Sequence, residues 1–133
     1  MSMNDCVKFG QFIKQLRLAK GITAREASQA AGMLPSNFSK LEHGALNPTK
    51  DNAKQKELAA AIGIKPDSEE AGAFFDLAAR ANETVPVDIA DIISEDDAMP
   101  LLLRTIGNKR LTKADIKRLI EIVRGTGNAG KKP

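Results

Sequence analysis

The chain has little of what most enzymes and disulfide-stabilised proteins need. Its 133 residues include no tryptophan, no tyrosine, one cysteine and one histidine. A single cysteine excludes an internal disulfide, and we expect Cys6 to be a spectator thiol in a poorly ordered N-terminal stretch. No apolar run is long enough to cross a bilayer and no signal-peptide pattern is present. These absences predict a soluble, cytoplasmic protein.

The motifs of common catalytic and metal sites are also missing. There is no glycine-rich phosphate loop, no pair of histidine ligands and no CxxC. Five carboxylates gather in one segment but lack the spacing and central glycine of a calcium loop: Asp88, Asp91, Glu95, Asp96 and Asp97. Helix capping and solvated faces explain them better than a metal does. We therefore expect a non-enzymatic protein with no cofactor and no bound metal.

Charge is distributed unevenly along the chain. Residues 1–66 carry 10 Lys and Arg against 5 Asp and Glu, residues 67–97 carry 1 against 10, and residues 98–133 carry 9 against 2. A basic first segment suits a polyanion such as DNA. The acidic middle is either held away from DNA or is an ordinary solvated face.

The first half of the chain predicts three helices separated by glycines. The first ends at Gly21, and four of its apolar residues share one face: Phe9, Phe12, Ile13 and Leu16. Thr23 and Glu26 form a capping-box pattern that opens a second helix, which ends at Gly32. Pro35 begins a third, which runs to Gly44. Two short helices joined by a tight glycine turn are typical of DNA-binding proteins.

The third predicted helix has two different faces. Phe38 and Leu41 point inward together with Met33 from the turn. The opposite face is polar and carries no carboxylate; it contains Ser36, Ser39, Lys40 and His43. Such a face suits hydrogen bonding to base edges or phosphates in a major groove, although a solvated helix face has the same composition.

Several further residues occur in a recognisable order: Arg17, Gly21, Thr23, Glu26, Gly32, Ser39-Lys40-Leu41-Glu42-His43-Gly44, Asn47-Pro48 and Ile62-Gly63-Ile64. On these residues the segment 7–64 resembles the phage repressor and Cro-like helix-turn-helix family, the XRE family of bacterial and phage regulators. The resemblance implies an all-α fold, a five-helix bundle whose third helix contacts the major groove, commonly as a dimer on a palindromic operator.

The resemblance also implies roles for individual residues. Pro35, Ser36 and Lys40 match the family's base-contacting positions, with Asn37 beside them. The family's phosphate-contacting positions match Thr23, Ala24, Arg25, His43 and Asn47. Arg17 and Glu42 match its structural ion pair between the first and third helices.

The chain departs from the family in three places. Ala27 and Ala31 replace larger aliphatic residues, which leaves a thin core under the second helix. Leu34 replaces the usual Ser or Thr cap, and Pro35 has no backbone N–H, so base contact by Pro35 is apolar, for example with a thymine methyl. Residues 50–57 form a link to the next helix that is longer than usual.

Residues 67–124 predict further helices. Asp67 with Glu70, Asp97, and Thr112 with Asp115 provide three capping patterns. A short helix begins at Pro86, and residues 125–133 form a disordered tail. The last two helices carry more apolar surface than so small a chain easily buries, which predicts a homodimer interface through Leu101, Leu102, Leu103, Ile120 and Val123. Packing of these residues on the N-terminal bundle is the alternative.

The sequence thus predicts a helix-turn-helix DNA-binding domain over residues 1–66 and a helical dimerisation region over residues 67–124. The function that fits best is a sequence-specific transcriptional repressor that binds operator DNA as a homodimer. The alternative is an antitoxin, which binds a partner toxin through its second half and autoregulates its operon. A regulatory peptidase is a further conceivable partner.

Overall fold

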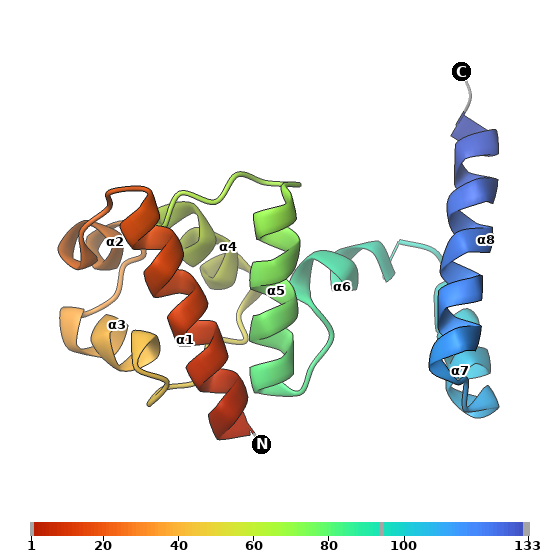
Figure 1. The fold of residues 1–133 in the computed structure, drawn as a ribbon, viewed down its shortest axis with the longest axis horizontal. Helices are drawn as coiled ribbons and strands as arrows, with labels where there is room; N and C mark the ends of the chain where they lie inside the picture. Colours follow the sequence, from red (N-terminus) through yellow and green to blue (C-terminus); the bar gives the residue numbers. More distant parts are fainter. Residues whose placement is uncertain (1, 94, 132–133) are drawn as a thin grey trace. The chain divides into compact units, whose positions relative to one another are not determined.

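The structure is a computed structural model that describes residues 2–93 and 95–131. All regular secondary structure in these residues is helical (Figure 1). The helices are α1 (Ser2–Ala19), α2 (Ala24–Ala30), α3 (Pro35–Glu42), α4 (Asn52–Ala61), α5 (Glu69–Asn82), α6 (Val87–Ile93), α7 (Met99–Lys109) and α8 (Lys113–Lys131). The predicted all-α class is confirmed, and α1–α5 form the predicted five-helix bundle. None of the helices in these ranges is both long and apolar enough to cross a membrane.

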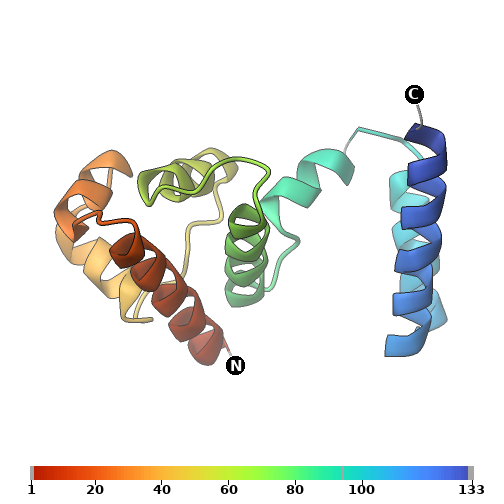
Figure 2. The same ribbon diagram turned by 45° about the horizontal axis from the view of Figure 1, so that its top comes forward.

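The core of the bundle is built around α1. This helix contacts α3 and, most extensively, α5 (Figure 1 and Figure 2). Phe9 and Ile13 of α1 are fully buried, and the Phe9 ring centroid lies 5.2 Å from that of Phe74 in α5. Phe38 of α3 and Ile62 complete the same cluster. The aromatic side chains therefore fill the space that Ala27 leaves under α2.

The boundary of the first compact unit differs from the expected one. The sequence pattern placed it after Pro66, whereas the chain divides between Ile92 and Ile93. The reason is that α5 contributes to the core: Phe74 and Ala78 are fully buried. The apolar face of α5, which lies in the segment that the sequence analysis assigned to a dimerisation region, is instead packed on α1.

The capping residues agree with those expected from the sequence at two helix starts and differ from them at three. Capping boxes form at Thr23 with Glu26 and at Thr112 with Asp115. Ser68, not Asp67, caps α5, because Asp67 has a left-handed backbone with φ of 63°. Near α7, the carboxylate that accepts a backbone hydrogen bond, from Ala98, belongs to Asp96 rather than Asp97. Residues 50–57 are not a long link, because Asp51 caps α4 and the helix begins at Asn52.

The N-terminal stretch is more ordered than its composition predicted. Cys6 lies within α1 and is only 4% exposed. Burial raises the pKa of the Cys6 thiol, and the neighbouring Asp5 carboxylate raises it further. The thiol therefore remains protonated and packs as a small apolar group, which agrees with the spectator role predicted for it.

Gly10 lets α1 and α3 approach closely. A β-carbon at this position would lie 2.5 Å from the carbonyl oxygens of both Leu41 and Glu42. Any other residue would have to push the end of α3 away from α1. Sequence patterns gave no sign of this requirement, because the contact joins residues that lie some thirty positions apart.

A buried ion pair joins the same two helices, as the family resemblance implied. Arg17 Nε donates to Glu42 Oε2 at 2.7 Å, and Arg17 Nη2 donates to Glu42 Oε1 at 3.0 Å. A third bond runs from Arg17 Nη1 to the carbonyl oxygen of Ile22. Hydrogen bonding to Glu42 raises the pKa of Arg17 above its usual value, against the opposing effect of burial. The pair is bidentate, and it fixes the end of α3 on α1.

The second unit contains α7 and α8 and has no comparable core. Every residue of α7 has substantial exposure, and the apolar residues predicted for the dimer interface are 44–66% exposed: Leu101, Leu102, Leu103, Ile120 and Val123. Helix α8 continues to Lys131 where a disordered tail was expected from residue 125. Gly125, Gly127 and Gly130 in that stretch each disfavour a helix relative to alanine, so its sequence gives the helix little support.

Two glycine substitutions test the packing of α1 on α3. Gly10→Ala should destabilise the protein by about 1–3 kcal/mol, because the added methyl group meets rigid backbone. Gly72→Ala in α5 is the matched control: a β-carbon there meets nothing within 4 Å. It should stabilise the protein by about 0.5–1 kcal/mol through helix propensity. Urea denaturation measures both, and equal effects of the two substitutions would contradict the close contact at Gly10.

Disruption of the ion pair should cost stability rather than DNA contacts. Arg17→Ala should lower the free energy of unfolding by about 3–5 kcal/mol, because it leaves Glu42 buried and uncompensated. The double variant Arg17→Met with Glu42→Leu should be more stable than Arg17→Ala, since no buried charge remains. Thermal and urea denaturation provide the measurement. Unchanged melting combined with lost DNA binding would instead make Arg17 a DNA-contacting residue.

Candidate nucleic-acid interface

Helices α2 and α3 pack against each other and present the predicted recognition face. Phe38 and Leu41 are buried at 1% and 2% exposure, while Ser36, Ser39 and Lys40 are exposed. The two-faced character predicted for the third helix is therefore confirmed. Its start has no side-chain cap, because Leu34 stands at the N-cap and Pro35 follows it.

The residues predicted to contact DNA are available at the surface. Nine of the ten are exposed and one, Asn37, is half-buried; the exposed ones are Thr23, Ala24, Arg25, Pro35, Ser36, Ser39, Lys40, His43 and Asn47. Exposure is necessary for a contact with DNA but does not show whether a residue meets a base or a phosphate. The hydrogen bonds and charges around each residue indicate which of these contacts it can make.

One group of these residues surrounds a groove between α2 and α3. The groove has a volume of about 540 Å³, and its lining includes Arg25, Pro35 and Ser39. Among the described residues the guanidinium group of Arg25 has no hydrogen-bond or ion-pair partner, and the same holds for the ammonium group of Lys40. Two cations without carboxylate partners on adjoining helices favour a phosphate or a guanine edge.

A second groove, of about 430 Å³, lies where α3 approaches α4. Its lining includes Asn37 and Asn47 together with Leu34 and Lys54, which sequence analysis did not select. Lys54 is exposed and lies in the first turn of α4, where its ammonium can meet a phosphate beside α3. Asp51 is the signal in the sequence that could have identified Lys54, because a capping aspartate indicates that a helix begins in this segment. Leu34 is 65% exposed, which extends the apolar surface of Pro35.

Thr23 and His43 each already have one hydrogen-bonding role. Thr23 Oγ1 accepts from the Glu26 amide, and its hydroxyl hydrogen remains free to donate to a phosphate. His43 Nδ1 lies 2.7 Å from the carbonyl oxygen of Ser39. Since a carbonyl oxygen only accepts, Nδ1 carries the hydrogen, and the neutral ring has none left at Nε2. Only the imidazolium form of His43 can therefore donate to a phosphate.

Asn47 joins its loop to the end of α5. Its Nδ2 lies 3.3 Å from the carbonyl oxygen of Ala81 and 3.5 Å from Asn82 Oδ1. Both side-chain N–H groups thus have acceptors within the protein, and a contact with phosphate falls to the backbone N–H of Asn47. The side chain positions the loop after α3, a role that the spacing of residues did not reveal.

The carboxylates of α2 and α3 are neutralised or directed elsewhere, whereas Glu57 of α4 is exposed at the second groove. Glu42 is paired with Arg17 in the interior, and Glu26 accepts a hydrogen bond from the Thr23 amide at the start of α2. The exposed face of α3 consequently presents hydroxyl groups, one amide and one ammonium group, with no exposed acid on that helix. A polyanion can approach it without like-charge repulsion from α3.

Comparison with known proteins agrees with this geometry. Residues 8–71 match a family described as a helix-turn-helix domain. No curated protein and no solved structure matches the chain significantly. The matched range contains α2, α3 and all ten residues of the predicted DNA-contacting set. Residues 8–71 therefore form a helix-turn-helix domain similar to those of XRE-like DNA-binding proteins, which supports a role as a DNA-binding regulator.

Proposed function

We propose that this regulator is a repressor that binds a palindromic operator as a homodimer, with α3 in the major groove. The observation that carries the proposal is the exposed face of α3, which combines Ser36, Ser39 and Lys40 with no exposed carboxylate. The side chains at the start of α3, Pro35 and Ser36, are small enough to enter the major groove. Phe38 and Leu41 anchor the inner face of this helix in the core. Occupancy of a promoter by such a protein blocks the polymerase.

Direct base contacts come from the start of α3 in this proposal. Lys40 donates to guanine or to phosphate, and the serine hydroxyls adapt to either a donor or an acceptor. Leu34 and Pro35 form an apolar tip that meets a thymine methyl group. Arg25 and Lys54, on either side of α3, bind phosphates and set the orientation of the helix.

The homodimer is supported by the incomplete packing of the second unit. Helices α7 and α8 leave an apolar groove of about 530 Å³ between them, whose lining includes Leu102, Ile106 and Leu119. None of the described α8 side chains, at residues 113–125, is buried. Two helices without a core are not stable alone, and a second copy of the same pair supplies the missing surface. The two DNA-binding domains of the dimer then contact half-sites about 34 Å apart.

The antitoxin alternative assigns the same apolar surface to a different protein. A toxin bound over Leu101 and Val123 would bury those side chains in place of a second copy. The helical character of residues 99–131 favours the dimer, because neutralising segments of antitoxins are commonly disordered until they bind. A small toxin or a repressor-cleaving peptidase encoded by the neighbouring reading frame would favour the alternative partners.

Substitutions on α3 test the DNA contacts. Lys40→Ala should weaken binding to a selected operator by about 1–3 kcal/mol, with relaxed specificity at one base pair if Lys40 contacts guanine, and uniformly if it contacts phosphate. Ser36→Glu should abolish binding through repulsion by the phosphates. Lys8→Ala, which removes an exposed lysine of α1 outside the predicted interface, is the control. Fluorescence anisotropy with labelled duplexes measures all three, and wild-type affinity of Lys40→Ala would remove α3 from the groove.

Charges placed on the apolar surface of α7 and α8 test the dimer. The double variant Leu101→Asp with Val123→Asp should sediment as a 14.3 kDa monomer at micromolar concentration, whereas the wild type should sediment near twice that mass. The variant should retain half-site binding but lose about 10²–10⁴-fold in affinity for the full operator, because the second contact is no longer intramolecular. Leu18→Asp, at a leucine of α1 that is 58% exposed, should leave the dimer intact. A monomeric wild type would support the antitoxin alternative.

A further inference from the structure

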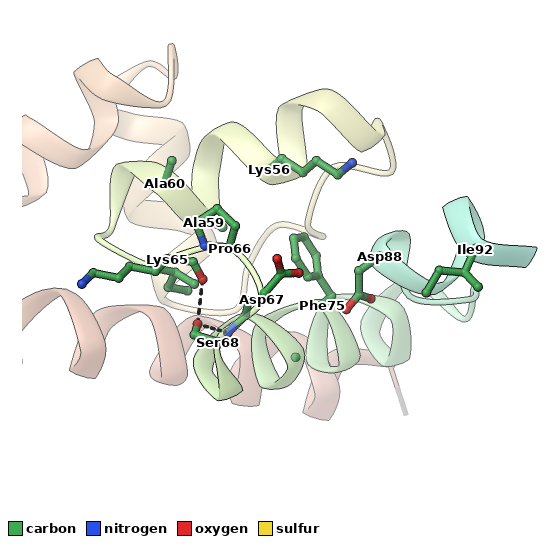
Figure 3. A pocket seen from close by; sticks show the side chains of 13 residues that line it. Lys56, Ala59, Ala60, Lys65, Pro66, Asp67, Ser68, Phe75, Asp88 and Ile92 are labelled. Carbon is green, nitrogen blue, oxygen red and sulfur yellow. Dashed lines mark hydrogen bonds between the residues drawn. The ribbon is translucent and has the colours of Figure 1, made fainter. Parts of the chain in front are cut away.

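A cavity of about 620 Å³ lies between α4, α5 and α6, apart from the DNA-contacting surface (Figure 3). No residue that lines it belongs to the set predicted to contact DNA. Its volume falls within the range of small-molecule sites, which combine mainly apolar walls with a few polar groups. Its lining includes Lys56 of α4, Asp67, Phe75 of α5 and Asp88 of α6 (Figure 3).

Small side chains leave this space open. The residues that line the cavity include Ala59 and Ala60 of α4 and Ala71 and Gly72 of α5. Gly72 lies inside a helix, where glycine costs stability relative to alanine. No neighbouring atom lies within 4 Å of the position that its β-carbon would occupy. Packing within the protein therefore does not explain the glycine, whereas a molecule seated in the cavity would.

One carboxylate at the cavity lacks a hydrogen-bond donor. Asp88 Oδ1 is shielded from solvent and has no hydrogen-bond partner among the described residues. Asp88 lies in the first turn of α6, where a negative charge complements the helix dipole. The helix dipole stabilises the negative charge of Asp88 but does not provide a hydrogen-bond donor to Oδ1. A shielded acceptor without a donor is costly, and a bound N–H group would satisfy it.

The backbone at the rim is held in an uncommon conformation. Asp67 has a φ of 63°, which is unusual for a residue other than glycine. Ser68 fixes this turn: its Oγ donates to the carbonyl oxygen of Lys65 at 2.7 Å and accepts from the Ala71 amide at 3.1 Å (Figure 3). The turn thereby places a second carboxylate, that of Asp67, beside the opening. Strained residues held in this way are common at binding sites.

We propose that this cavity binds a small, mainly apolar molecule that carries an ammonium group. The ammonium pairs with the Asp88 carboxylate, which turns to bring Oδ1 to the cavity, and the apolar body lies against Phe75 and in the space above Gly72. Phe75 is 7% exposed, so its ring forms a wall that is already in place. Since α6 is the last helix of the first unit, a bound molecule braces the segment from which the chain continues to α7.

Tryptamine is a suitable probe because the protein contains no tryptophan and no tyrosine. Emission of the indole ring therefore reports on the probe alone. Addition of full-length protein to dilute tryptamine should shift its emission to the blue and raise its anisotropy with a Kd on the order of 1 mM, as expected for a molecule of this size. Tryptophol, which replaces the ammonium by a hydroxyl group, should bind about tenfold more weakly.

Matched variants assign the binding to this cavity. Asp88→Asn should weaken tryptamine binding about tenfold, and Gly72→Leu should abolish it by filling the space. Asp76→Asn, at an exposed aspartate of α5, and Gly107→Leu, at a helical glycine with open surroundings, should have no effect. Gly72→Ala should weaken binding while raising the melting temperature, a combination that misfolding cannot produce. Equal binding of tryptamine and tryptophol, binding unchanged in Asp88→Asn and Gly72→Leu, or the absence of a saturable change would overturn the proposal.

Discussion

The orientation of α3 depends on one buried contact between charged side chains. The bidentate bonds from Arg17 to Glu42 tie the last residue of α3 to the last turn of α1. Gly10 makes this contact possible, because only a residue without a side chain lets the two backbones come so close. The pair also removes the only acidic side chain of α3 from its exposed face. A single interaction therefore fixes the orientation of α3 and leaves its exposed face without an acidic side chain.

The start of α3 is held by packing instead of capping. Leu34 and Pro35 provide neither a capping hydroxyl group nor a backbone amide at the first helical position. Phe38 and Leu41 compensate by anchoring the helix in the core. In place of a cap, Leu34 and Pro35 form an exposed apolar tip at the position where members of the resembled family contact bases. The start of α3 therefore lacks a cap and exposes an apolar surface instead.

The two units of the chain differ in what stabilises them. The first has a core of aromatic and aliphatic side chains shared by α1, α3, α4 and α5. The second consists of two amphipathic helices whose apolar residues remain substantially exposed. In the dimer that we propose, the first unit binds DNA and the second unit gains its stability by association. The same division leaves α6, with the cavity beside it, as the last element of the stable part.

The sequence alone determined α1, α2 and α3, their amphipathic faces and two capping boxes, because these follow from periodicity and from residues only three or four positions apart. The family resemblance located the Arg17–Glu42 pair in advance. Only the tertiary structure decided that α5 belongs to the core, that Gly10 must be glycine, that Asn47 is engaged with α5, and that Lys54 lies beside α3. Each of these depends on segments distant in sequence that meet in space, and a local pattern carries no information about which distant segment will cover it.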